Sequence, residues 1–401
     1  MVAPVLTPNY TSKPHLLADF NMMGIQWNSG TQSWQLEFTV TDDHGNVTSF
    51  TETYVPTPDD KVTIYDLCEL LRPYFNLTDH PGLTGYGSIG LKCLDNSRRV
   101  KLVLAIHGVS SAEGWDGVIN LNGDDTTISA LYFVYSNATS GKLHSGTDAT
   151  GGIGSRFLSR CNLLTAASEQ PCAVSWFGHG ETLKVKLLHY VNGIPQQTDL
   201  PDVTAEDTDN MQTYNFTLAA LAEVAGIDVK NVICADLQLF LNSSPQDSMR
   251  FMHETRHRAH ERVFAFIGAM GEPEFFAMTG SDNREAEYEG VFLMEHNDYR
   301  KADTTLRCIH TAHTGSLSEG ERELLWDMAA SPWVYVIENG QLREVTITEV
   351  ELNDTVPHRE PIGFRVKWRY TSELAQRTFT RATEQNDITV ISNDDTIHGL
   401  E

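Results

Sequence analysis

The sequence is poor in basic residues and in long apolar runs. It holds 29 Lys and Arg against 54 Asp and Glu, a formal net charge of −25. An acidic chain lacks the basic face that nucleic acid phosphates require, and it is repelled by an anionic membrane surface. No apolar run approaches the roughly 18 residues of a membrane-spanning helix, and the first residues show no basic leader before an apolar segment. We therefore expect no nucleic acid and no membrane as partners, and synthesis in a cytoplasm.

Cysteine pairs are also absent. The cysteines occur singly and never as CxxC, which is typical of reduced, mostly buried thiols in a chain of this length. The six residues are Cys68, Cys93, Cys161, Cys172, Cys234 and Cys308. We expect no disulfide framework.

Strong catalytic motifs are missing as well. The chain has no GxSxG nucleophile elbow and no GxxxxGK[ST] phosphate loop. Gly85–Gly90 spells GxGxxG, but the residues that follow indicate strand, turn and strand, whereas a dinucleotide site needs a helix there. We therefore predict that the protein is not an enzyme and holds no cofactor.

The chain does contain enough apolar residues for large cores. It has 401 residues and 44.8 kDa, of which 40% are hydrophobic, so more than one domain is expected. Period-two alternation of apolar and polar residues predicts half-buried strands over several segments. These are 34–40, 99–107, 128–135, 183–190, 211–216 and 232–241. The sequence predicts a mainly β, multi-domain protein built of β-sandwich-like domains with a few short helices.

Turns and helices punctuate these strands. Asn192-Gly193 and Asn339-Gly340 suit the positive backbone angles of tight hairpins. Apolar residues at helical spacing predict helices at 64–75, which Pro73 should distort or end, and at 218–225. A third helix is predicted over 318–330, where Ser318 and Glu321 have the spacing of a capping box.

Composition suggests four parts. Residues 1–136 form an N-terminal β-rich domain with one helix near 64–75, and residues 156–285 form a central β-rich domain. Residues 286–382 form a C-terminal β domain with the helix at 318–330, followed by an acidic tail at 383–401. Polar segments rich in Gly, Ser, Thr or Pro at 137–155 and 195–210 are predicted to be loops or linkers.

The sharpest single motif is the HExxH string from His253 to His257. On a helix, both imidazoles would share one face and bind zinc, Glu254 would activate a water, and His260 would lie one turn further on. However, arginines crowd the segment, and their positive charge opposes a bound dication. The sequence therefore assigns no catalytic and no metal residues, and it keeps His253, His257 and His260 as candidates for a zinc hydrolase. The structural alternative is a solvated helix or loop, or a subunit contact.

Residues 250–262, which include this string, form a concentrated basic patch in an acidic chain, and we call them the basic segment. Its four arginines would dock an acidic surface on another copy or another protein, unless they form only a solvated face. They are Arg250, Arg256, Arg258 and Arg262.

Tryptophans leave a further alternative open. Stacked on a surface they would form a platform for a sugar, whereas at alternating strand positions they fill cores. The residues concerned are Trp115, Trp176, Trp326, Trp333 and Trp368. A glycan-binding β-sandwich with a receptor-recognition role is thus a rival function, and cell-surface glycan a rival partner.

Two stretches resemble a known class of proteins. Phe264–Gly280 resembles a strand–turn–strand signature of tail-associated structural proteins of phages and prophages of Bacteroidota, in which Phe-x-Asn-x-x-Gly-x-x-Glu is usual. Phe266, Gly271 and Glu274 match that pattern, and Gly268 stands where it has Asn. The stretch from Thr314 to Tyr370 is similar to the C-terminal β domain of those proteins.

The resemblance implies a virion protein and carries no catalytic residue. Such a protein would be a tail or baseplate component of a phage or phage-like particle. It would act as a homo-oligomer or beside other virion proteins through subunit contacts. The two polar linkers, the basic segment and the acidic tail are the predicted contact regions.

Overall fold

A computed structural model shows a mainly β protein, as the alternation of residues predicted. The chain divides into two compact units. Unit 1 comprises Met1–Thr255 and Phe266–Phe275, and unit 2 comprises Arg256–Ala265 and Phe276–Glu401. The structure describes residues 5–7, 15–20, 22–26, 33–94, 99–109, 116–118, 130–143, 155–205, 207–255, 261–280, 282–295, 298–314, 317–352, 363–372, 380–382 and 388–390.

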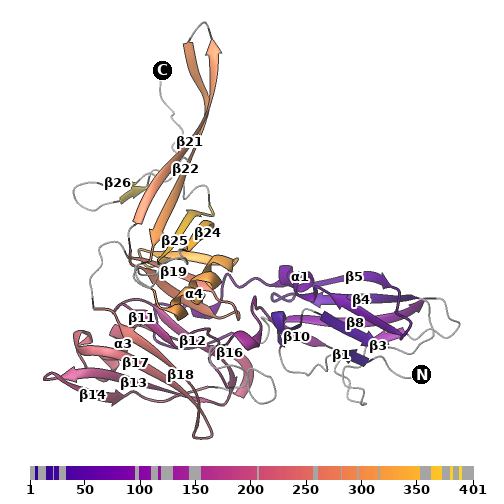
Figure 1. Cartoon of the computed structure of the whole chain (residues 1–401), viewed down its shortest axis with the longest axis horizontal. Helices are drawn as coiled ribbons and strands as arrows, with labels where there is room; N and C mark the ends of the chain where they lie inside the picture. The colour runs from indigo at the N-terminus through magenta and orange to yellow at the C-terminus, as the bar shows by residue number, and fades with distance from the viewer. Residues whose placement is uncertain are drawn as a thin grey trace. The chain divides into compact units, whose positions relative to one another are not determined.

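The first part of unit 1 contains two sheets (Figure 1). The smaller has the order β1 (Val5–Thr7), β3 (Met22–Gln26), β6 (Lys61–Tyr65). The larger has the order β2 (His15–Leu16), β10 (Leu131–Val134), β8 (Val100–Val109), β4 (Ser33–Thr41), β5 (Val47–Tyr54), and β9 (Asp116–Val118) pairs with β8.

Alternation explains the core of the larger sheet. Along β4 the residues Trp34, Leu36, Phe38 and Val40 are buried, and the intervening residues are not. Successive side chains of a strand point to opposite faces, so this spacing places all four on one face. Phe38 also stacks on Phe50 of β5 with ring centroids 5.0 Å apart, which ties the edge strand to its neighbour.

The helix predicted at 64–75 is shorter than its apolar spacing suggested. Ile64 belongs to β6, and the helix α1 covers Leu67–Leu71 before a 3₁₀ turn η2 at Arg72–Tyr74. Pro73 lies in that turn, where its missing N–H and fixed φ end the regular helix. Two further short segments are η1 (Leu17–Phe20) and α2 (Pro81–Thr84).

The second part of unit 1 contains two more sheets. One has the order β11 (Leu163–Ala166), β18 (Ser244–His253), β17 (Val232–Leu241), β13 (Thr182–Val191), β14 (Ile194–Asp199), and β15 (Val203–Thr204) pairs with β13. The other has the order β12 (Cys172–His179), β16 (Asp207–Phe216), β7 (Gly90–Leu94). Helical segments are η4 (Ser140–Lys142), α3 (Leu218–Ala225) and η5 (Val229–Asn231).

Two details of this part bear on the predictions. Helix α3 has the predicted bounds and ends at Gly226, whose φ of +68° is the left-handed cap that glycine favours. The segment 195–210 is not the polar linker that its composition suggested. Most of it forms β14, β15 and the start of β16. Backbone N–H and C=O groups form the hydrogen bonds of a sheet whether the side chains of the strand are polar or apolar.

The sheet formed mainly by unit 2 has seven strands, two of which include residues of the segment Phe266–Phe275. Their order is β20 (Pro273–Met278), β19 (Arg262–Ile267), β23 (Val334–Glu338), β24 (Gln341–Leu352), β25 (Phe364–Tyr370), β22 (Asp298–His313), β21 (Asp282–Glu295). Helix α4 covers Glu319–Ala330, and β26 (Thr380–Ala382) pairs with β27 (Ile388–Val390). The predicted hairpin turn at Asn339-Gly340 is confirmed, with φ values of +51° and +73°.

The start of α4 confirms the predicted capping box. The backbone N–H of Ser318 donates to Glu321 Oε2 at 2.9 Å, and the N–H of Glu321 donates to Ser318 Oγ at 3.3 Å. The helix buries Leu324, Leu325 and Met328, the apolar stripe read from the sequence. The division at 136–156 lies within unit 1 and stays a prediction, as does the independent folding of residues 286–382.

Candidate interaction surfaces

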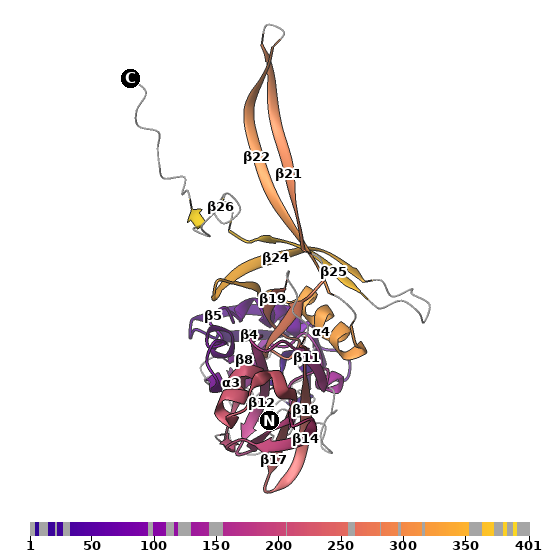
Figure 2. The same ribbon diagram turned by 90° about the vertical axis from the view of Figure 1, so that its left-hand side faces the viewer.

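A long two-stranded ribbon is the most prominent feature of unit 2 (Figures 1 and 2). Strands β21 and β22 pair antiparallel from Asp282 opposite Ala312 to Glu295 opposite Asp298. Strand β25 pairs with β22 only at 310–313. We call residues 285–295 and 298–309 the ribbon. At the rise of a strand, each arm extends about 35 Å, and neither has a third strand among the residues described.

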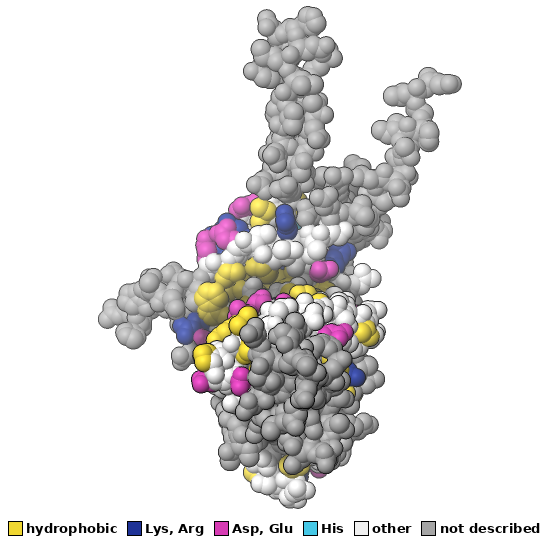
Figure 3. Space-filling model, turned by 90° about the vertical axis from the view of Figure 1, so that its right-hand side faces the viewer, with side chains coloured by type: hydrophobic (Ala, Val, Ile, Leu, Met, Phe, Trp, Pro, Cys, Tyr) yellow, Lys and Arg dark blue, Asp and Glu magenta, His cyan; other side chains and the backbone are white. Residues whose placement is uncertain are grey.

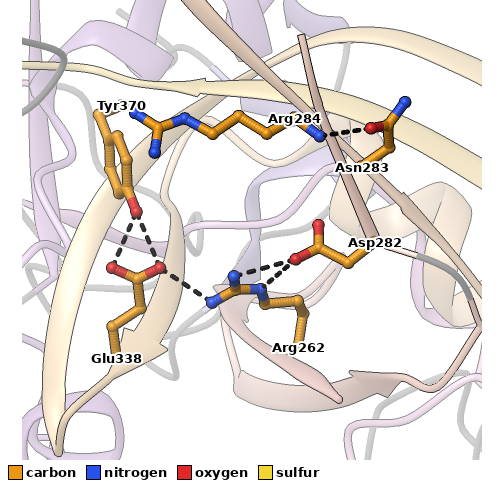
Figure 4. Close-up of polar contacts among 6 residues, drawn as sticks. All are labelled: Arg262, Asp282, Asn283, Arg284, Glu338 and Tyr370. Carbon is orange, nitrogen blue, oxygen red and sulfur yellow. Dashed lines mark hydrogen bonds and ion pairs between the residues drawn. The ribbon is translucent and has the colours of Figure 1, made fainter. Parts of the chain in front are cut away.

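An ion-pair network lies at the base of the ribbon (Figure 4). Arg262 of β19 donates to Asp282, the first residue of β21, at 3.0 Å, and to Glu338 of β23 at 3.1 Å. The hydroxyl of Tyr370 on β25 donates to both carboxylate oxygens of Glu338 at 2.8 Å. Burial, and then the hydrogen bond and charge of Glu338, raise the pKa of Tyr370. Four strands of one sheet are therefore tied together where the ribbon begins.

A second cluster lies beside that network. The guanidinium of Arg284 donates from Nε and Nη2 to Cys308 Sγ at 3.3 and 3.2 Å, across the β21–β22 pair. His310, two residues further along β22, stacks on Trp368 of β25. Burial is the largest cause that lowers the pKa of His310, and the charge of Arg284 is the next. Both effects favour the neutral form of the imidazole at the ribbon's base.

The basic segment is only partly described. Arg250 forms a two-pronged ion pair with Asp236, with Nε–Oδ1 and Nη2–Oδ2 distances of 2.5 and 2.7 Å. Arg262 is committed to Asp282 and Glu338, while Arg256 and Arg258 lie outside the described residues. The role of these arginines in contacts stays a prediction, and two of them already have partners within the chain.

The HExxH string does not begin on a helix. His253 is the last residue of strand β18. On a strand, residues four apart lie about 13 Å from each other, too far for both imidazoles to bind one ion. Its Nε2 lies 2.9 Å from Ser168 Oγ and its Nδ1 2.9 Å from the carbonyl of Val232. His257 and His260 lie outside the described residues. The helical placement behind the zinc hypothesis was wrong at His253, and the metal content itself is a matter for assay.

Three further features bear on the predictions: clusters of metal-binding residues, disulfides and membrane-spanning helices. Within the described ranges, no three His, Cys, Asp or Glu residues are arranged to hold a metal. The six cysteines are thiols, and most of them are buried, as predicted; Cys93 is exposed and the other five are buried. No helix in that same part of the chain is long and apolar enough to cross a membrane.

Two of the five candidate tryptophans fill cores, and Trp333 is half-buried. Trp176 and Trp368 are fully buried, and Trp326 is 43% exposed. Trp326 also meets Phe364 edge-on at 6.0 Å, which is a packing contact. Trp115 lies outside the described residues. Figure 3 shows hydrophobic, acidic and basic side chains beside one another, a mixture that does not distinguish an interface from the rest of a protein surface.

The stretch that resembles phage tail proteins is a strand, a tight turn and a strand, as predicted. The N–H of Gly268 donates to the carbonyl of Glu272 at 2.6 Å, and Glu272 Oε2 accepts from the N–H of Met270 at 2.7 Å. A Cβ at Gly268 would lie 2.5 Å from Glu272 Oε1. The Glu272 side chain thus covers position 268, and this explains why glycine stands there instead of the usual Asn.

Gly271 is equally constrained. Its φ is +84°, and a Cβ there would lie 2.5 Å from the carbonyl oxygen of Tyr135. The carbonyl of Ala269 accepts from the N–H of Asn137 at 2.7 Å, so the turn packs on residues 135–138 within unit 1. The motif is a structural one: its residues form and anchor a turn.

Sequence reasoning missed the ribbon. The segment 286–382 was interpreted as one compact domain, although β21 and β22 have 14 and 16 residues. A signal was present in the alternation Glu285, Glu287, Glu289 and in the absence of Pro and of turn pairs such as Asn-Gly from 282 to 313. Whether a third strand pairs with a hairpin depends on the tertiary structure. The alternation of polar and apolar residues along the sequence does not show it.

Fold and surfaces together define a mainly β protein of two units with an extended two-stranded ribbon. No family model and no curated protein matches the chain. Solved structures of phage-like particles match part of it. A chain of the native gene transfer agent virion has 8% identity, a TM-score of 0.21, and covers 29% of this chain and 95% of its own length. A chain of the anti-feeding prophage baseplate has 11% identity, a TM-score of 0.21, and covers 30% of this chain and 94% of its own.

Proposed function

We propose that this protein is a structural component of a phage-like particle, of tail or baseplate type, and that it acts through contacts with copies of itself and with other virion proteins. The observation that carries the proposal is the ribbon. A two-stranded β-ribbon alone is marginally stable in water, and unpaired strand edges are places where another chain adds. A subunit that is completed on assembly would have such an element.

The sheet of unit 2 supports the same proposal. The two stretches that resemble tail-associated proteins, 264–280 and 314–370, contribute β19 and β20 and then β23, β24 and β25. These five strands are consecutive neighbours in the sheet order. Phe264 meets Trp368 edge-on at 5.9 Å, so the two stretches also share a core. The resemblance therefore covers one coherent piece of structure and not two unrelated segments.

Particle fractionation tests the proposal. Lysate of cells that carry this gene is separated on a density gradient, and an antibody against the chain locates it in fractions and on negatively stained particles. We expect the chain in the particle fractions and bound at one end of the particle. A chain that stays in the soluble fractions while intact particles sediment would contradict a structural role.

The two rival functions have their own readouts. A glycan-binding role requires quenching of tryptophan fluorescence by oligosaccharides, with loss in a Trp326→Ala variant. A zinc hydrolase requires stoichiometric zinc in the purified protein, lost in a His257→Ala variant. We propose that the protein is neither, and a positive result in either assay would overturn that part of the proposal.

A further inference from the structure

We propose that the ribbon pairs edge to edge with the ribbon of a second copy, strand β21 of one against strand β22 of the next, and that repetition closes a ring of ribbons. This inference rests on the proposed function, because it names one of the contacts by which the subunit would assemble. It concerns self-association, which the particle experiment does not measure.

The ribbon differs from the edge strand β5 because no third strand pairs with it among the described residues. Strand β5 is also an edge strand, but all eight of its residues pair with β4, and β4 pairs with β8 behind it. The ribbon has no such support: from the pair Glu285–Ile309 to the pair Glu295–Asp298 it is two strands wide. Among the described residues, both of its long edges therefore present unpaired backbone N–H and C=O groups.

The two arms differ in charge. Residues 285–295 of β21 include four glutamates and no Lys or Arg, a net charge of −4. Residues 298–309 of β22 include three basic and two acidic residues, a net charge of +1. The basic residues are Arg300, Lys301 and Arg307. An acidic edge and a basic edge on one element are complementary between copies, although the chain as a whole is strongly acidic.

Strand direction fits the same arrangement. When ribbons stand side by side in one orientation, β21 of one copy runs opposite to β22 of the next. The new pair is thus antiparallel, like the pair within each ribbon. The contact is heterologous, because two different edges meet, and such contacts close into rings when the rotation between copies allows it. A closed ring of strands has no free edge left.

Charge reversal on one arm at a time tests the inference in the full-length chain. The variant Glu285→Lys/Glu289→Lys/Glu295→Lys changes the β21 arm from −4 to +2, because each of three reversals adds two charges. The variant Arg300→Glu/Lys301→Glu changes the β22 arm from +1 to −3 by the same arithmetic. No replaced residue acquires a like charge opposite it in its own ribbon. Its register partner is uncharged, or is Asp298 in the case of position 295.

The mixture of variants gives the decisive readout. Light scattering should show a closed oligomer of fixed copy number for the wild type and monomers for each variant alone. An equimolar mixture should restore the oligomer, since each altered arm then meets an arm of opposite sign. The control variant Asp59→Lys/Glu169→Lys/Glu223→Lys makes the same change in net charge at exposed positions of unit 1 and should assemble like the wild type.

Each other outcome overturns the inference. A wild-type chain that is monomeric at every concentration and ionic strength tested has no self-pairing ribbon. An oligomer that both arm variants retain is held by another surface. Circular dichroism and thermal unfolding of the variants show that loss of assembly is not loss of folding. Failure here, with the chain still found on particles, would leave the proposed function standing with another partner for the ribbon.

Discussion

His310 stacks on Trp368 with ring centroids 4.3 Å apart and an interplanar angle of 16°. The two residues are register partners on β22 and β25, and Tyr370 meets the same imidazole edge-on at 5.4 Å. The imidazole is 7% exposed, and its Nε2 has no hydrogen-bond partner among the described residues. The base of the ribbon thus contacts the sheet through a buried histidine, a position that favours the neutral imidazole.

This stack predicts a stability that falls in acid. Burial and the positive charges of Arg284 and Arg262 lower the pKa of His310, while Asp282 and Glu338 oppose them. Since the unfolded chain then binds a proton more readily, stability is complete above the ordinary histidine pKa of about 6.5 and decreases as the pH falls from there towards the lowered value. Thermal unfolding of a His310→Phe variant, measured from pH 5 to 8, should show a smaller loss of Tm than the wild type.

The chain has fifteen histidines, so the comparison of the two curves, and not the total loss of Tm, isolates the contribution of His310. Parallel curves for the wild type and the His310→Phe variant would show that this imidazole does not contribute to the acid sensitivity.

The ion-pair network gives a prediction about stability at neutral pH. Replacing Arg262 by Met removes a cation that bridges Asp282 and Glu338, two half-buried carboxylates, although Arg343 still lies 3.6 Å from Glu338. We expect unit 2 to lose about 1–3 kcal/mol, the range for hydrogen bonds to charged groups. Hydrogen exchange of peptides from β19 and β23 measures the loss.

A matched surface pair calibrates that loss. Arg365 and Glu351 form a more exposed ion pair at 2.9 Å on neighbouring strands of the same sheet. An Arg365→Met variant should cost about 0–1 kcal/mol, as exposed pairs do. Equal losses in the two variants would mean that the network at the ribbon's base has no special weight.

The glycine of the turn predicts a difference between two substitutions. Gly271→Ala and Gly193→Ala both place a Cβ on a residue with positive φ, which costs about 1–2 kcal/mol. At Gly271 the Cβ would also lie 2.5 Å from the carbonyl oxygen of Tyr135, whereas nothing lies within 4 Å at Gly193. Urea unfolding should therefore show a clearly larger loss for Gly271→Ala. Equal losses would mean that the carbonyl moves aside freely.

The capping box of α4 predicts a moderate loss of helix stability on substitution of Ser318 by Ala, most of which Thr at the same position should restore. Ser318→Ala removes the acceptor for the N–H of Glu321 and should destabilise the helix by about 1 kcal/mol. Ser318→Thr keeps a hydroxyl at the same position and should restore most of the loss. Faster hydrogen exchange in the first turn of α4, confined to the Ala variant, is the expected signature.

Local elements could be predicted because their causes lie within a few residues of sequence. Strand β4, helix α3 with its glycine cap, and the box at Ser318 and Glu321 follow from alternation, propensity and capping. The prediction of a linker at 195–210 was wrong because polar side chains indicate exposure to solvent and not the conformation of the backbone. A polar segment still forms a strand when a neighbour such as β13 offers its backbone.

The candidate contact residues could also be predicted only in part. Sequence identified Arg250 and Arg262 by charge, but only the fold shows that Asp236 already binds the first and that Asp282 and Glu338 bind the second. Ion pairs between strands far apart in the chain depend on sheet order, which a charge count does not contain.

By itself, then, the sequence determined the mainly β class, the free thiols, the hairpin turns and the two longer helices, because short-range backbone geometry and side-chain alternation fix them. Tertiary structure alone decided that β19 lies next to β23, that β25 pairs with only four residues of β22, and that the rest of that hairpin is a ribbon. The physical reason is that a strand's backbone groups can pair with any strand that reaches them. Which one does so is decided by packing over the whole chain.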